Sequence, residues 1–87
     1  MTDFSLLAAQ VRAARALLGW SQGYLADGCK VSRSTIAELE AAKRKPHDAT
    51  LFVILSELSN AGIEFTEHGV SFREYPPPNY VPTSVSK

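Results

Sequence analysis

At 87 residues with a formal net charge of zero, the chain is long enough for one domain near the lower size limit for folding alone, and its charge excludes the strongly basic proteins that coat nucleic acid. One cysteine and two histidines exclude an internal disulfide and supply too few ligands for a closed zinc site, so we expect no metal or other cofactor. The longest apolar run, residues 51–55, is too short to span a membrane, so we expect a soluble, cytoplasmic protein.

Two helices are expected in the first third of the chain. The first begins at a cap provided by Asp3 or Ser5 and extends to about Leu18, with Gly19 as the residue that stops it. Ser21 has the side chain to cap a second helix over residues 22–29, because its hydroxyl can accept a hydrogen bond from a free amide of the first turn.

A third helix is expected after the cap Ser32, close enough to the second to form a helix-turn-helix arrangement. Its apolar residues Ile36 and Leu39 face inward by helical spacing. The other sides of this helix carry small, polar and charged residues, namely Arg33, Ser34, Ala37 and Glu38.

A basic loop broken by Pro46 separates the third helix from a fourth, which Asp48 can cap and which covers residues 49–60. Four large apolar residues fill one stripe of the fourth helix: Leu51, Ile54, Leu55 and Leu58. Phe52 and Val53 point away from this stripe and therefore need another surface to cover them.

The period of the apolar residues changes from about 3.6 residues to about 2 after the fourth helix. Ile63 and Phe65, then Val70 and Phe72, alternate with polar residues on either side of a short connection that contains a glycine. This pattern predicts a β-hairpin. An isolated hairpin is marginally stable in water, so this one either packs on the helices or pairs with another chain.

The sequence thus predicts a mainly α fold, with a four-helix domain over residues 1–62, a C-terminal β-hairpin over residues 63–75 and a disordered, proline-rich tail over residues 76–87.

The charge is unevenly divided along the chain. Residues 1–47 carry seven basic and four acidic side chains, a net of +3, and residues 48–87 carry two basic and five acidic ones, a net of −3. This division favours a positive face on the first half and leaves the second half for a different contact.

The run RALLGWSQGYLADGCKVSRSTIAELEAAKRKP, residues 15–46, resembles the helix-turn-helix domain of the Cro-like phage repressors, the XRE family. The likeness covers about residues 10–62 and depends most on S-Q-x-x-L-A at residues 21–26 and S-x-S-T-I-x-x-L-E at residues 32–40. It implies a Cro-like domain in which the third helix enters the major groove of double-stranded DNA.

The resemblance implies that the first exposed positions of the third helix read bases. Arg33 can donate two hydrogen bonds to guanine, Ser34 is less selective, and Glu38 can accept a hydrogen bond from cytosine. The alternative for Arg33 is a solvated charge at the start of a helix.

Other family positions imply contacts with the DNA backbone. Gln22 matches a position that holds a phosphate, and Thr35 matches one near the backbone. The alternatives are an ordinary surface residue for Gln22 and a hydroxyl bonded back to its own helix for Thr35. The loop that lies along the DNA in the family corresponds here to Lys43, Arg44 and Lys45, for which a merely solvated loop is the alternative.

Arg15 and Glu40 match a family pair that joins the first helix to the end of the third. The chain departs from the family pattern at Lys30 and Ala42, where glycine is usual. A residue with a Cβ then adopts positive φ at these positions, or the helices end differently. Cys29 matches an apolar core position, so we expect a buried thiol in preference to a redox sensor.

Together these features predict a sequence-specific transcriptional regulator, namely a repressor of an inverted-repeat operator that can control its own gene. We expect it to be a homodimer, because a single reading helix contacts too few base pairs for useful specificity. The expected dimer surface consists of Phe52, Val53, Phe65, Val70 and Phe72. The alternative is an antitoxin or another interaction protein that holds a partner protein through its C-terminal half. An enzyme is disfavoured, because no convincing carboxylate pair or glycine-rich phosphate loop is visible.

Overall fold

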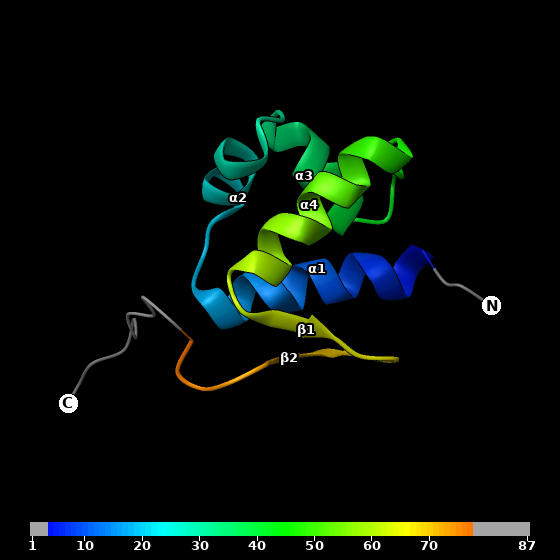
Figure 1. Cartoon of the computed structure of the whole chain (residues 1–87). Helices are drawn as coiled ribbons and strands as arrows, with labels where there is room; N and C mark the ends of the chain where they lie inside the picture. Colours follow the sequence, from blue (N-terminus) through cyan, green and yellow to red (C-terminus); the bar gives the residue numbers. More distant parts are fainter. Residues whose placement is uncertain (1–3, 78–87) are drawn as a thin grey trace.

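Four helices form most of the structure, a computed structural model that describes residues 4–77 (Figure 1). The helices are α1 (Phe4–Leu18), α2 (Gln22–Cys29), α3 (Arg33–Glu40) and α4 (Asp48–Asn60). An antiparallel sheet of two strands follows, β1 (Ile63–Phe65) and β2 (Val70–Phe72). The prediction of a mainly α fold with a C-terminal hairpin is confirmed. Residues 78–87, most of the predicted tail, lie outside the described residues.

The two short helices begin at the caps expected from the sequence. The Ser21 hydroxyl accepts a hydrogen bond of 3.0 Å from the amide of Tyr24, and the Ser32 hydroxyl accepts one of 3.2 Å from the amide of Thr35. Each bond satisfies a first-turn amide that has no partner within its own helix. These serines therefore determine where α2 and α3 start.

The start of α4 differs from the prediction, and at α1 only Ser5, one of the two predicted caps, can be compared with the structure. Helix α1 begins at Phe4, so Ser5 lies within the helix, and Asp3 lies outside the described residues. Helix α4 begins at Asp48 and its cap position is His47, which has extended backbone angles and no side-chain cap bond. The prediction that Asp48 caps α4 is wrong by one residue, because its carboxylate lies in the first turn, where negative charge is favoured by the helix dipole.

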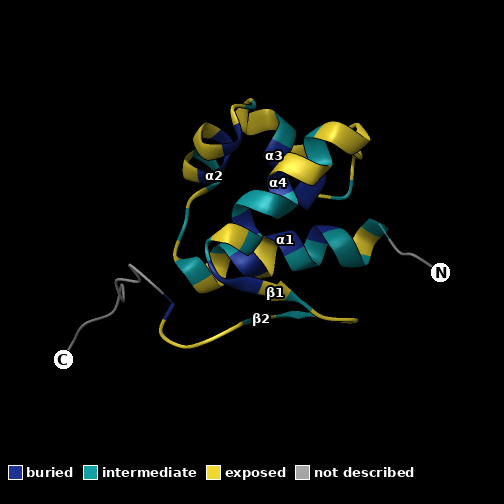
Figure 2. Ribbon diagram, viewed as in Figure 1, coloured by how far each residue is buried: buried dark blue, intermediate teal, exposed yellow. Residues whose placement is uncertain are grey.

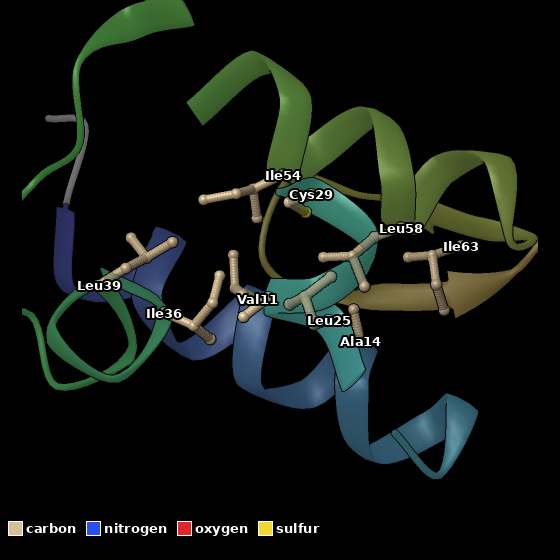
Figure 3. Close-up of a cluster of buried hydrophobic side chains, with 10 residues drawn as sticks. Val11, Ala14, Leu25, Cys29, Ile36, Leu39, Ile54, Leu58 and Ile63 are labelled. Carbon is tan, nitrogen blue, oxygen red and sulfur yellow. The ribbon is translucent and has the colours of Figure 1, made fainter. Parts of the chain in front are cut away.

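The hydrophobic core draws on all four helices and on β1. Ile36 and Leu39, predicted to face inward from α3, are fully buried. Burying each such side chain stabilises the fold by about 1.5–3 kcal/mol relative to exposure. Figure 3 shows them converging with side chains from the other elements, namely Val11, Ala14, Leu25, Cys29, Ile54, Leu58 and Ile63.

The hairpin packs on the helices, which was one of the two arrangements that the sequence allowed. Strand β1 lies against α4 and β2 lies against α1. In this register Ile63 pairs with Phe72, and Phe65 pairs with Val70. Ile63 is fully buried, and the other three side chains are half-buried against the same core. In Figure 1 the sheet lies at the end of the molecule away from α2 and α3.

Two polar side chains fasten the hairpin to the helices. Gln10 of α1 donates from Nε2 to the carbonyl oxygens of Thr66 and Gly69, at 2.9 Å each, where the hairpin turns. Arg73, just after β2, donates from its guanidinium to the carbonyl oxygen of Ser59 at the end of α4 and to a carbonyl oxygen of β1. The sheet is thus held at both ends by bonds that cross between elements.

Candidate nucleic-acid interface

The outward face of α3 carries the three residues predicted to read bases. Arg33, Ser34 and Glu38 are exposed, whereas Ile36 and Leu39 on the opposite side are fully buried. Figure 2 shows the same division along α3 between exposed and buried positions. The helix is therefore anchored along one side and presents the other to solvent, as a groove-binding helix requires.

A cluster of hydroxyl groups lies at the start of this face. The Ser32 hydroxyl lies 3.0 Å from the hydroxyl of Ser34 and 3.0 Å from that of Thr35. Thr35 is thus bonded back to its own helix in the free protein, in agreement with the alternative reading of this residue. Because a hydroxyl both donates and accepts, Ser34 and Thr35 keep the capacity for a further hydrogen bond.

A left-handed turn fixes the basic loop relative to α3. The amide of Ala42 donates to the carbonyl of Leu39 at 3.0 Å, and the amide of Lys43 donates to the carbonyl of Glu38 at 2.9 Å. This pair of bonds is the Schellman motif that ends many helices. Beyond the turn lie the three loop residues predicted to contact phosphates, Lys43, Arg44 and Lys45. All three are exposed, and no ion pair within residues 4–77 involves them.

Both positions where the family usually has glycine adopt positive φ. Lys30, between α2 and α3, has φ 62° and ψ 39°, and Ala42 has φ 58°. The amide of Val31 bonds to the carbonyl of Ala26 at 3.0 Å, so the turn keeps its hydrogen bonds although Lys30 carries a Cβ. The sequence allowed either positive φ at these positions or a different end to each helix, and the structure has positive φ at both.

Glu40 joins three helices at the buried end of α3. Its carboxylate is 3% exposed and accepts two hydrogen bonds from the Arg15 guanidinium, at 2.8 and 2.9 Å, and one from Gln22 Nε2 at 3.0 Å. Arg12 donates to the backbone carbonyl of Glu40 at 2.6 Å. Helices α1 and α2 are therefore both bonded to the last residue of α3.

The surroundings of Glu40 keep it charged. Burial alone raises the pKa of its carboxyl, but the hydrogen bonds from Arg15 and Gln22 and the charges of Arg15 and Arg12 outweigh burial and hold the pKa below its ordinary value. The predicted ion pair between Arg15 and Glu40 is thus present in the structure. A bidentate pair of this kind sets orientation more than it adds stability.

Gln22 lies at the first turn of α2 with one side of its amide committed to Glu40. The second hydrogen of its Nε2 stays available, because a side-chain amide has two donors. Gln22 and Arg33 line the same recess of about 530 Å³, together with Arg15, Ser21 and Gly23. The structure therefore brings a predicted phosphate contact and a predicted base-reading residue into one concave surface.

Sequence reasoning missed two supports of this arrangement. Arg12, to which the sequence assigned no role, donates to the carbonyl of Glu40, and Arg15 also donates to the carbonyl of Trp20 at 2.9 Å. The spacing of Arg12 and Arg15, three residues apart, puts both on one face of α1 and was an available signal. The carbonyl partners had no signal, because they depend on how the helices pack.

The five residues predicted to form a dimer surface lie in two different environments. On α4, Phe52 is 70% exposed and Val53 is 42% exposed. Phe65, Val70 and Phe72 are half-buried against the chain's own core. Within the described residues, only the α4 pair thus remains largely uncovered among these five.

Cys29 is buried in the core, where burial and the charge of Glu57 raise the pKa of its thiol to about 11. A thiol in this state is a poor nucleophile and metal ligand.

Among residues 4–77 there is no group of three or more His, Cys, Asp or Glu side chains positioned for a metal ion. The helices of the same part of the chain are also too short or too polar to cross a membrane.

The sequence matches the family model described as Helix-turn-helix over residues 11–59, which is more than half of the chain. The chain belongs to the XRE-type helix-turn-helix family. It is accordingly a DNA-binding regulator of this type, in a family of DNA-binding domains and not of enzymes. The matched residues contain α2, the turn at Lys30 and α3, so the family assignment and the exposed face described above concern the same part of the molecule.

Solved structures that resemble this helix-turn-helix protein include two with the same degree of similarity to it. One is described as "MDT Protein" and the other as "Structure of HipA-HipB-O2-O3 complex". Each has a TM-score of 0.61 and 27% sequence identity, over 68% of this chain and 83% of the other. A comparison with curated proteins gave no match.

Proposed function

We propose that this protein is a sequence-specific transcriptional repressor that binds an inverted-repeat operator as a homodimer. The observation that carries the proposal is the outward face of α3, where Arg33, Ser34 and Glu38 are exposed next to the cations of residues 43–45. Arg33 supplies two donors in the geometry of the guanine acceptors. The loop cations supply affinity and salt dependence with little sequence information.

A second copy of the chain is part of the proposal, because a single α3 contacts too few base pairs for useful specificity. Two copies related by a two-fold axis present their reading helices about 34 Å apart, one turn of DNA. Phe52 and Val53 support the dimer, because large apolar side chains this exposed favour a partner surface. The hairpin residues contribute only the parts of their side chains that the core leaves uncovered.

Selection of bound DNA from a random pool tests the proposal with the full chain. An enriched inverted repeat with half-sites about 10 base pairs apart supports a dimeric reader. Arg33→Lys keeps the charge but loses the two-pronged donor, so it should weaken the preference at one position of each half-site by about 1–3 kcal/mol.

Lys45→Ala is the matched control. It should weaken binding to all sequences by the same factor and reduce the salt slope by about 0.9 for each subunit, about 1.8 for the dimer. Equal, salt-sensitive binding to operator and scrambled DNA would contradict sequence-specific repression, as would an Arg33→Lys variant with an unchanged base preference.

The second candidate is an antitoxin or other interaction protein that also binds DNA. It is supported by the similarity to a structure described as a HipA-HipB-O2-O3 complex and by the distance of the hairpin from α3. Co-expression with the product of an adjacent gene tests this candidate. A stable one-to-one complex that survives Arg33→Ala favours it, and a homodimer that ignores each such product contradicts it.

A further inference from the structure

A cavity of about 540 Å³ lies between α3, the loop that follows it and the first turn of α4. It is named here the α3–α4 cavity, and its volume is in the range of pockets that hold small molecules. The lining comes from Val31 and Ser32, from Thr35 and Glu38, and from residues 44–47 with Thr50. Several of these residues, including His47 and Thr50, have no part in the proposed contacts with DNA.

One wall of the α3–α4 cavity is cationic. Arg44 and Lys45 are exposed and supply its positive charge, and the exposed His47 side chain lines the cavity beside them. No ion pair within residues 4–77 involves any of the three. Guanidinium and ammonium groups that are free to donate hydrogen bonds bind phosphoryl oxygens strongly. The positive wall therefore favours a ligand with a phosphoryl group.

The remaining lining suits a ligand that has more than a phosphoryl group. The hydroxyls of Ser32, Thr35 and Thr50 add hydrogen-bonding capacity, and Val31 with Pro46 adds an apolar surface. Glu38 also lines the cavity and carries the opposite charge. Its carboxylate repels a phosphoryl group but accepts hydrogen bonds from a hydroxyl or amino group at the other end of a ligand.

We propose that the α3–α4 cavity binds a small phosphorylated molecule bearing hydroxyl or amino groups, of the size of a sugar phosphate or a mononucleotide, and that this ligand competes with DNA. The competition rests on the proposed function, because Glu38, Arg44 and Lys45 line the cavity and belong to the proposed DNA contacts. A molecule in the cavity engages these side chains and places negative charge beside the reading helix. The ligand therefore releases the repressor from its operator.

Titration of the full, isotope-labelled chain with ribose 5-phosphate, followed by amide NMR shifts at constant ionic strength, tests the site. Saturable shifts are expected at Ser32, Thr35 and Thr50, with ribose causing none. His47→Ala and Thr50→Val should each weaken binding by about tenfold, the effect of losing one hydrogen bond to a charged group. The matched control His68→Ala removes an exposed histidine from the hairpin turn and should change nothing.

The DNA arm measures operator binding by fluorescence anisotropy with and without the same probe. Ribose 5-phosphate should raise the apparent Kd for the wild-type chain, and about ten times as much of it should be needed for the same effect on Thr50→Val. If the chain binds its operator but ribose 5-phosphate causes no saturable NMR shifts, the ligand site is overturned and the proposed function stands. The α3–α4 cavity would then hold nothing but a backbone phosphate of the DNA. Saturable shifts without operator binding would keep the site and overturn the proposed function. Binding of both ligands at once would overturn the competition.

Discussion

The left-handed turn at the end of α3 predicts that Ala42→Gly stabilises the protein. Ala42 has φ 58°, and its amide bonds to Leu39 in the turn, so the backbone cannot relax without breaking that bond. A left-handed residue with a Cβ costs about 1–2 kcal/mol, which glycine avoids. Glycine also gains freedom in the unfolded chain, which offsets about 0.5–1 kcal/mol. The net expectation is a gain of about 0.5–1 kcal/mol in the free energy of unfolding.

Urea and thermal unfolding at a fixed protein concentration measure this gain, because dimerisation would otherwise shift the midpoint. For a domain of this size the expected rise in Tm is about 2–8 °C. Ala41→Gly is the matched control, since Ala41 has φ −87° and no strain to relieve; it should lose about 0.5–1 kcal/mol. If the two variants shift the midpoint in the same direction, the strain argument is refuted.

Three further predictions follow from single side chains. Glu40→Gln should destabilise the fold by about 2–3 kcal/mol, less than for a fully enclosed pair because the Arg15 side chain is 21% exposed. Since the pKa of Glu40 is lowered in the folded protein, the stability advantage of the wild type is complete above the unfolded pKa of about 4.3 and shrinks as the pH falls below it. Urea unfolding that gives the same difference between the two proteins at pH 7 and at pH 3 would contradict this. Arg73→Gln should speed hydrogen exchange of the hairpin amides by about tenfold or more without affecting α1, whereas a uniform change would indicate global destabilisation instead. Cys29, with a thiol pKa of about 11, should react with a thiol reagent at pH 8 only as the chain unfolds, and rapid labelling of the folded protein would show that the thiol is accessible.

The helix starts show which caps could be predicted from neighbouring residues alone and which could not. Ser21 and Ser32 could be assigned from the sequence because an N-cap bond joins residues three apart in the chain. The same reasoning failed by one residue at Asp48, because a carboxylate is favourable both at the cap and in the first turn. Neighbouring positions with similar energies cannot be separated without the surrounding structure.

Contacts between a side chain and a distant backbone carbonyl were beyond the sequence. Gln10, Arg12 and Arg73 each donate to carbonyls that packing alone brings near. Any polar residue can make such a bond, so its type carries no signal about the partner. Likewise, the alternation at Phe65 and Phe72 predicted that one face is covered, but only the structure shows that the chain's own helices cover much of it.

The carboxylate of Glu40 has a consequence for how the protein meets DNA. Because it is bonded to α1 and α2 and belongs to the end of α3, the helices that carry the proposed base contacts and the proposed phosphate contact Gln22 are fixed relative to one another before any DNA binds. The conformational freedom of the binding surface is lost during folding and need not be lost again on association. Each contact formed then brings the next within reach, so a DNA site of the wrong shape loses several contacts together.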